Sequence, residues 1–357
     1  MNYQKKYIKY KNKYTHLKGG TDYTFDINKI KGVLYGVAVG DALGTRYEFS
    51  EAIDASIKVD SDMLDDHLPL LGGGPFNTLP GQISDDTEMS LCLLGSLANL
   101  GVYDQNDVAK KYIEWFRSKP IDIGKTIYRS LFTRKPSLTR DDMIKNSMEL
   151  NSASLSNGVL MRISPLAVYS IKLSTKDLNF AIKKECELTH PNAIIYDAVS
   201  VYCLAIKYLI NGITIDELYD KLENECCKTP RVKILLRDSF YNPEPSYVID
   251  EDLRERYIKT DDKKYQGYFG VAFQNAFYEL FNGTDFESSL INIIKRGGDT
   301  DTNCAIAGGL LGAYYGYDSI NKNWINTIKN TNYERINKYP YLGVNKIDTY
   351  INQLFNK

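Results

Sequence analysis

The chain has 357 residues, with 44 basic and 45 acidic side chains and a formal net charge of −1 at pH 7. A chain of this length can bury a large core, as one large domain or two average ones. A charge so close to zero gives no argument for a nucleic acid or a membrane as partner, and we expect neither.

The N-terminal residues differ in composition from the rest. "MNYQKKYIKYKNKYTHLKGG" contains six lysines and no acid, and it lacks the apolar core of a signal peptide. We interpret residues 1–25 as a Lys/Tyr-rich tail, either solvated or a lone amphipathic helix; a basic address or nucleic-acid contact is the alternative. The domain then occupies residues 26–357.

The cysteines and the hydropathy indicate the compartment. The six cysteines show no CxxC spacing, so we expect reduced thiols in a soluble, intracellular (cytoplasmic) protein. Separately, we expect a monomer. Three histidines without a Cys/His cluster argue against a zinc site. No stretch approaches the roughly 20 apolar residues that span a bilayer, and the apolar segments 33–39 and 305–315 predict short buried helices.

From about Asp26 onward, apolar residues recur at three- and four-residue spacing and strand-like alternation is scarce. This pattern predicts an all-α fold, with central helices that are apolar on most faces. Along the chain, "INKIKGVLYGVAVGDALG" has glycines at 32, 36, 40 and 44, which predicts a helix face that packs closely on a neighbour. Residues 45–85 look like loop, and residues 228–265 look like a charged surface excursion.

Two acidic segments directly precede apolar helices. "GQISDDTEM" places Ser84, Asp85 and Asp86 before one helix, and "RGGDTDTN" places Asp299, Asp301 and Thr302 before another. Helix capping explains one such residue at each start. It does not explain neighbouring like charges, which repel unless a cation lies between them. Oxygen ligands without Cys or His suit Mg²⁺, Mn²⁺ or Ca²⁺, so the pattern leaves both capping and a joint metal site open.

A further segment, "GDALGTRYEF", overlaps the end of the glycine-rich helix and continues beyond it. It contains two acids, Asp41 and Glu48. We interpret Asp41 as a packing residue near the end of that helix. Glu48 falls in a loop, where a rigid scaffold can hold a catalytic group. The pattern alone does not distinguish Glu48 from the other acids.

These segments, together with "DIGKT", "SNGVLMRISPLAV", "THPNAIIYDAV" and "GYFGVAF", occur in the order found in the ADP-ribosylglycohydrolases. The chain resembles this family, including its dinitrogenase reductase-activating branch, from about residue 28 to 316. The resemblance implies one all-α, orthogonal multi-helix bundle with two Mg²⁺ or Mn²⁺ ions. It also implies cleavage between the anomeric carbon of ADP-ribose and a modified acceptor.

The resemblance also implies roles for single residues. Glu48 would approach the ions and act as acid/base group, and Asp122 would face the acceptor side chain. The family usually has threonine where this chain has Ser84. The implied metal ligands are Ser84, Asp85, Asp86, Asp299, Asp301 and Thr302, and the implied substrate contacts are Ser156, Asn157, Gly158, His190 and Tyr268.

Structural interpretations compete with several of these roles. Asp122 could cap the following helix, and His190, before Pro191, could end its own helix where a cation favours the dipole. Asn157 and Gly158 could form a plain turn, and Tyr268 could be a core or rim residue. We interpret Arg162 and Arg296 as buried structural partners of acids.

The sequence therefore predicts a hydrolase that releases ADP-ribose from a protein side chain, arginine favoured, or from a small-molecule conjugate. ADP-ribosyl-serine and O-acetyl-ADP-ribose are alternative substrates. A catalytically silent ADP-ribose-binding protein is a second alternative, against which the complete ligand set and Glu48 argue. A metal-dependent hydrolase of a pyrophosphate is a third.

Overall fold

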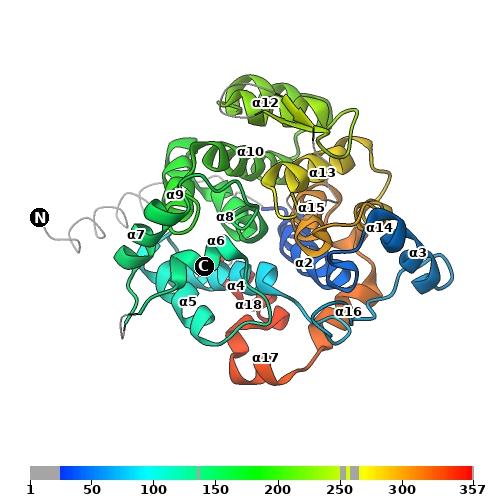
Figure 1. Cartoon of the computed structure of the whole chain (residues 1–357), viewed down its shortest axis with the longest axis horizontal. Helices are drawn as coiled ribbons and strands as arrows, with labels where there is room; N and C mark the ends of the chain where they lie inside the picture. Colours follow the sequence, from blue (N-terminus) through cyan, green and yellow to red (C-terminus); the bar gives the residue numbers. More distant parts are fainter. Residues whose placement is uncertain (1–24, 135–136, 250–254, 258–264, 356–357) are drawn as a thin grey trace, which may run out of the picture.

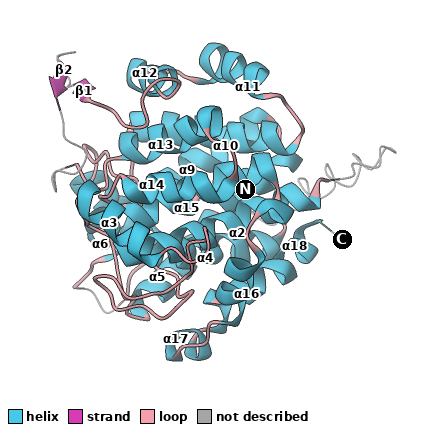
Figure 2. Cartoon of the chain, turned by 90° about the vertical axis from the view of Figure 1, so that its right-hand side faces the viewer, coloured by secondary structure: helices cyan, strands magenta, loops and turns pink. Residues whose placement is uncertain are grey.

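The computed structural model describes residues 25–134, 137–249, 255–257 and 265–355. The expected basic tail, apart from residue 25, lies outside the described residues, so its role and the division at residue 25 stay predictions. Figure 1 shows the chain as helices packed around a central pair, and Figure 2 shows the same arrangement from the side.

Apart from one short ribbon, the regular secondary structure of the described residues is helical, which confirms the all-α prediction. The α-helices are α2 (Ile27–Gly44), α3 (Ala52–Asp62), α4 (Asp85–Leu100), α5 (Gln105–Arg117), α6 (Lys125–Leu131), α7 (Arg140–Leu150), α8 (Ser164–Tyr169), α9 (Thr175–Glu187), α10 (Ala193–Ile210), α11 (Ile215–Lys221), α12 (Pro230–Asp238), α13 (Phe269–Asn282), α14 (Phe286–Lys295), α15 (Thr300–Tyr315), α16 (Lys322–Asn330), α17 (Glu334–Lys338) and α18 (Ile347–Phe355). Short helical turns are η1 (Thr45–Tyr47), η2 (Leu160–Arg162), η3 (Ser170–Lys172), η4 (Leu222–Cys226), η5 (Tyr317–Ser319), η6 (Pro340–Leu342) and η7 (Val344–Lys346). A small antiparallel ribbon pairs β1 (Tyr247–Ile249) with β2 (Glu255–Tyr257).

The prediction that residues 45–85 form a loop was wrong. Residues 45–85 contain helix α3, whose only buried residues are Ala55 and Val59, so its apolar stripe is too narrow to stand out. The excursion at 228–265 begins with α12, which starts at the side-chain cap Thr229 and packs on α13.

The centre of the fold is the antiparallel pair α2 and α15, which lie side by side in Figures 1 and 2. The glycine prediction is confirmed: a Cβ at Gly36 would lie 2.1 Å from the carbonyl oxygen of Gly308, and one at Gly32 would lie 2.2 Å from that of Gly312. Only glycine permits the two backbones to approach this closely. The pair therefore forms a rigid floor, with α2 buried from Gly32 through Gly44 and α15 from Thr300 through Ala313.

Helix α10 is the most apolar long helix of the described chain. Its 18 residues have a mean hydropathy of 1.7, enough by length and composition to cross a membrane, but 72% of them are buried inside the protein. This burial is the environment of a core helix. The sequence analysis named only the shorter apolar segments at 33–39 and 305–315, and α10 exceeds both.

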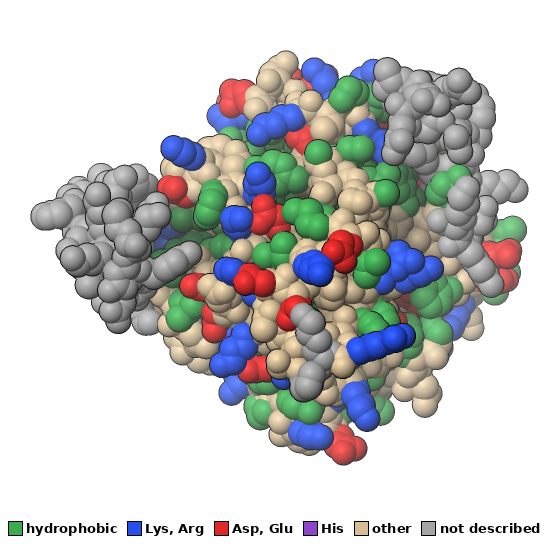
Figure 3. All heavy atoms as spheres, turned by 60° about the vertical axis from the view of Figure 1, so that its left-hand side comes forward, with side chains coloured by type: hydrophobic (Ala, Val, Ile, Leu, Met, Phe, Trp, Pro, Cys, Tyr) green, Lys and Arg blue, Asp and Glu red, His purple; other side chains and the backbone are tan. Residues whose placement is uncertain are grey.

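All six cysteines are unpaired. On the face drawn in Figure 3, basic and acidic side chains are interspersed with scattered hydrophobic ones, as the near-zero net charge leads one to expect.

Candidate active site

The antiparallel packing of α2 and α15 brings the end of one helix to the start of the other. The Thr300 hydroxyl donates a hydrogen bond to the Gly44 carbonyl oxygen at 2.8 Å. Beyond Gly44, the Phe49 N–H donates to the Gly298 carbonyl (2.7 Å) and the Gly298 N–H donates to the Ser50 carbonyl (2.9 Å). The turn that carries Glu48 is thereby bonded to the loop that carries Asp299.

Glycine is required in that loop. Gly297 has a φ of +73°, and a Cβ there would lie 2.4 Å from the Ser50 carbonyl oxygen. Both the left-handed backbone and the close approach exclude larger residues.

The start of α4 is held by Asp41, one turn before the end of α2. The Ser84 N–H lies 3.0 Å from both Asp41 carboxylate oxygens, and the Thr87 N–H donates to Oδ2 at 3.1 Å. Asp41 therefore caps a helix 43 residues away, a role that the sequence analysis missed. The only signal was an acid placed in an otherwise apolar, small-residue helix.

The N-cap side chains of α4 and α15 are not used for capping. Ser84 and Asp299 occupy the N-cap positions of α4 and α15, and neither side chain makes a capping hydrogen bond. The Ser84 hydroxyl instead donates to Asp86 Oδ2 at 3.0 Å. Capping is thus not the explanation for these acids.

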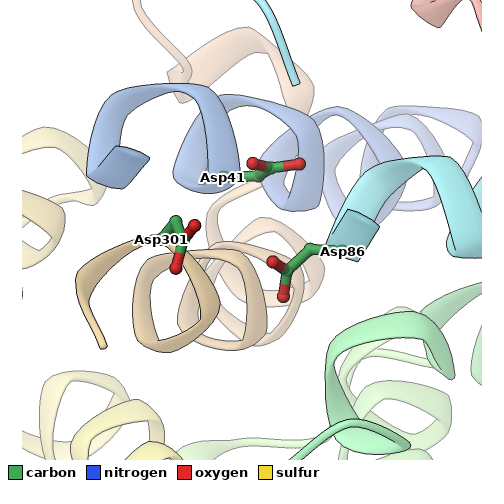
Figure 4. A group of neighbouring side chains, drawn as sticks. All are labelled: Asp41, Asp86 and Asp301. Atoms are coloured by element: carbon green, nitrogen blue, oxygen red, sulfur yellow. The ribbon is translucent and has the colours of Figure 1, made fainter. Parts of the chain in front are cut away.

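The carboxylates gather in two groups that share one member. One group is Asp41, Asp86 and Asp301; the other is Glu48, Asp299 and Asp301. Within each group, one oxygen from every side chain lies within 4.8 Å of the others. Figure 4 shows the first group, with one side chain from each of α2, α4 and α15. Asp301 joins the two groups into a single acidic centre.

The electrostatics of this centre favour a cation. Burial raises the pKa of Asp86 and Asp301 well above the usual range, and the neighbouring acids raise it further; burial likewise raises the pKa of Asp41 to about 6. Among the described residues, no Lys or Arg forms an ion pair with this centre. One buried oxygen, Asp86 Oδ1, has no hydrogen-bond partner. An all-oxygen donor set with an unpartnered carboxylate oxygen fits a hard divalent ion.

The remaining implied ligands border the centre. The Thr302 hydroxyl donates to Asp86 Oδ2 at 3.4 Å, so it lies beside the first group. Asp85 is buried but belongs to neither group. Burial and then the charge of Asp122 raise the pKa of Asp85 well above normal, which brings Asp122 into electrostatic reach of the site.

Two structural alternatives are wrong. The N-cap of α6 is Gly124, with no side-chain cap, so Asp122 does not cap that helix. His190 is fully buried, and its pKa is lowered well below the normal value by burial and by Arg162. It is therefore neutral near pH 7 and does not act as a cation at a helix end.

The segment Ser156–Gly158 lies against both the acids and α13. The Asn157 side-chain N–H donates to Asp299 Oδ2 at 2.7 Å, while its backbone N–H donates to the Gly267 carbonyl. Ser156 forms an antiparallel backbone bridge with Tyr268, and its hydroxyl lies 2.7 Å from His190 Nε2. A Cβ on Gly158 would lie 3.1 Å from the His190 ring. All five implied substrate residues thus belong to one contiguous cluster beside Asp299.

The structural interpretation of two arginines is confirmed. Arg162 is fully buried and its Nε donates to Glu185 Oε1 at 2.9 Å. Arg296 pairs with the carboxylate of Glu279 and donates to Asn275 Oδ1 at 2.7 Å.

Known proteins resemble the chain over nearly its whole length. Similar sequences include an assigned ADP-ribosyl glycohydrolase of Acanthamoeba polyphaga mimivirus (33% identity over 87% of this chain and 94% of that protein) and the ADP-ribosyl-[dinitrogen reductase] glycohydrolase of Rhodospirillum rubrum (28%; 83% and 89%). An ADP-ribosylarginine hydrolase of Serratia proteamaculans is 27% identical (85% and 75%).

A solved structure from an ADP-ribosylglycohydrolase-related protein complex has the same fold. Its TM-score is 0.64 at 24% identity, over 90% of this chain and 98% of that one. The sequence model of the family, ADP-ribosylglycohydrolase, matches residues 22–354. The chain therefore belongs to the ADP-ribosylglycohydrolase family and is a glycohydrolase enzyme.

Proposed function

We propose that this enzyme hydrolyses the bond between ADP-ribose and an ADP-ribosylated protein side chain, arginine favoured, with two Mg²⁺ or Mn²⁺ ions. The observation that carries the proposal is the acidic centre, in which Asp301 belongs to two carboxylate groups at once. A carboxylate with two oxygens can bridge a pair of ions. An ADP-ribosylarginine hydrolase among the similar proteins supports the acceptor.

The residues present fit two ions. Glu48, Asp299 and Asp301 would hold one, and Asp86 and Asp301, with the hydroxyls of Ser84 and Thr302, would hold the other. Asp85 would complete the ligand set from the start of α4. When bound, the ions would orient ribose hydroxyls and lower the pKa of a water molecule.

Side chains of the protein itself would carry out the cleavage and position the substrate. Glycosidic cleavage passes through an oxocarbenium-like state, which carboxylates near the anomeric carbon stabilise. Glu48, buried at the edge of the second group, would be the acid/base group. Asn157 would hold Asp299 in its orientation, and neutral His190 would fix the Ser156 hydroxyl for a substrate contact. Gly158 and Tyr268 would contact the substrate from the same cluster.

Substitution of the acids tests the metal assignment. Asp86→Asn and Asp301→Asn should each lower Mg²⁺- or Mn²⁺-dependent release of ADP-ribose about a thousandfold or more, because several kcal/mol of transition-state stabilisation depend on the ions. The matched control is Asp54→Asn, an exposed acid in the first turn of α3. Undiminished turnover in both site variants, or activity that survives complete chelation, would contradict the proposal. ADP-ribose binding without turnover by the native enzyme would favour the silent alternative.

A second experiment tests the acceptor. Asp122 would pair with the guanidinium of ADP-ribosyl-arginine, since a carboxylate accepts its forked donors. Asp122→Asn should therefore slow hydrolysis of ADP-ribosyl-arginine more than that of ADP-ribosyl-serine or O-acetyl-ADP-ribose. Equal losses on all three substrates would remove this role from Asp122.

A further inference from the structure

The inner face of α6 is bonded to the segment that borders the candidate site. The Ser156 hydroxyl donates a hydrogen bond to the Thr126 hydroxyl at 3.1 Å, and the Asn151 side-chain N–H donates to the Thr126 carbonyl oxygen at 2.8 Å. Ile127 is buried, and its Cδ1 would lie 3.1 Å from a Cβ on Gly158. Helix α6 is therefore fixed against the implied substrate residues.

The opposite face of α6 carries large exposed side chains. Its exposed residues are Lys125, Tyr128, Arg129 and, directly after the helix, Phe132. Their spacing of three and four residues places them on one side of the helix, where a surface helix ordinarily has polar or charged residues. The rings of Tyr128 and Phe132 are 42% and 45% exposed, and they stack with centroids 5.4 Å apart. Two aromatic rings therefore face solvent beside the candidate site.

A third ring extends this exposed group. Phe116, near the end of α5, meets Tyr128 edge to face, with centroids 5.8 Å apart. Phe116 is partly exposed, and the exposed Arg117 follows it. Aromatic and arginine side chains are the ones enriched where proteins bind each other. The α6 surface is defined here as Phe116, Arg117, Lys125, Tyr128, Arg129 and Phe132.

The α6 surface is positively charged. Residues 117–132 contain four cations and one acid: Arg117, Lys119, Lys125 and Arg129 against Asp122. Within the described part of the chain, none of these four cations forms an ion pair. Glu114 on α5 and Glu149 on α7 already pair with lysines one turn away on their own helices. A partner with acidic residues would therefore complement this surface.

Asp122 connects the α6 surface to the reacting end. The proposed function assigns Asp122 to the acceptor, and it stands two residues before Gly124, the N-cap of α6. Two residues of chain span at most about 7 Å. A modified side chain that reaches Asp122 would therefore bring the protein chain on either side of it next to α6.

We propose that the α6 surface binds the protein that carries the ADP-ribosyl group, at acidic and apolar residues that flank the modified side chain. The proposal rests on the proposed function, since it takes a modified protein as the substrate. It adds a preference for certain target sequences. The acids of the reacting end attract the guanidinium of the acceptor, whereas the α6 surface repels further cations around it.

The test compares two substrates that share the reacting bond. One is free ADP-ribosyl-arginine, and the other is a peptide with one ADP-ribosyl-arginine flanked by leucine and glutamate residues. Tyr128→Ala should raise KM for the peptide about tenfold, the usual effect of truncating a central aromatic contact, and Arg129→Glu should raise it about threefold to tenfold. Neither variant should change kcat or KM for free ADP-ribosyl-arginine, which does not reach the α6 surface. Added salt should weaken the effect of Arg129→Glu.

Helix α9 offers a matched control pair. Phe180 is 64% exposed there, and the exposed Lys183 follows three residues later. Phe180→Ala and Lys183→Glu remove the same kinds of side chain from a different helix. They should leave the kinetics of both substrates at the native values.

An unchanged KM for the peptide in Tyr128→Ala and Arg129→Glu, or an equal change for both substrates, would overturn this proposal and leave the proposed function intact. A single-stranded oligonucleotide that inhibits peptide cleavage more strongly than the unmodified peptide does would also overturn it, in favour of nucleic acid. A native dimer that Tyr128→Ala separates would overturn it in favour of a second copy of the chain. Native enzyme that cleaves neither substrate would overturn the proposed function and this proposal together.

Discussion

The acidic starts of α4 and α15 have similar sequences, but the protein holds them in place differently. The start of α4 depends on charged side chains: Asp41 caps it, and one turn further in, Glu88 is clamped between Arg335 and Trp115. The start of α15 depends on backbone contacts: glycines of α2 touch its carbonyl groups, and Gly298 pairs with the turn after Glu48. The side-chain interactions that hold the start of α4 can be removed one at a time. The backbone contacts between α2 and α15, in contrast, leave no space for even one added carbon atom.

The largest expected effect is therefore at the glycine contact. Gly36→Val would place a branched side chain where even a Cβ lies 2.1 Å from the Gly308 carbonyl oxygen. Backbone atoms cannot change rotamer to relieve this overlap, so we expect the free energy of unfolding to fall by more than about 5 kcal/mol. Thermal unfolding followed by circular dichroism would show no cooperative transition.

The control for this variant is Gly124→Ala, where an added Cβ meets nothing within 4 Å and φ is −60°. Its stability should stay within about 1 kcal/mol of the native value. A Gly36→Val protein that melts like the native one would show that α2 and α15 can separate at little cost.

The second-largest loss of stability is expected at the ion pair between Arg335 and Glu88, near the start of α4. Arg335 donates to both carboxylate oxygens of Glu88, at 2.5 and 2.6 Å, and Glu88 is 1% exposed. Arg335→Met leaves a buried carboxylate without its cation, which costs about 3 kcal/mol. Urea unfolding measures this loss. Lys338→Met, an exposed change on the same helix, should cost less than about 0.5 kcal/mol.

A double variant separates charge from packing at this position. Glu88→Gln combined with Arg335→Met removes both charges and keeps an acceptor for the Trp115 indole N–H. It should recover most of the stability lost in Arg335→Met, because no unpaired buried charge remains. If the double variant is as unstable as Arg335→Met, the pair acts through shape rather than charge.

The difference between the backbone contacts of α15 and the side-chain contacts of α4 also explains which features the sequence could predict. The glycine contact follows from a periodic pattern within one helix, and so do the all-α fold and the close packing of α2. The bonds of Asp41 to Ser84, and of Arg335 to Glu88 across 247 residues, depend on which helices become neighbours, and no local pattern encodes that. The acids of the candidate site were found because two helix starts share an unusual sequence.

The smallest loss of stability is expected at the ion pair between Arg46 and Asp62, next to the turn that carries Glu48. Arg46, in η1, donates to both oxygens of Asp62 at 2.7 and 2.9 Å, and to the Gly72 carbonyl. The hydrogen bond from Arg46 lowers the pKa of Asp62 below its usual value. Because the pKa of Asp62 is lower in the folded protein, Asp62 is protonated first in the unfolded chain as the pH falls. The stabilisation is therefore complete above the unfolded value of about 3.9 and is lost as the pH falls through the native value.

Asp62→Asn should consequently cost about 1 kcal/mol near pH 7, because the pair is partly exposed. The difference from the native protein should begin to shrink below about pH 4 and vanish once the pH is below the lowered pKa of Asp62 in the folded protein. Urea unfolding at a series of pH values measures it, with Asp54→Asn on the same helix as the control. A difference that stays constant down to pH 3 would mean that Asp62 acts as a neutral hydrogen-bond acceptor. The α15 start would then have no charge-based support at this position, which would make the contrast with the α4 start sharper.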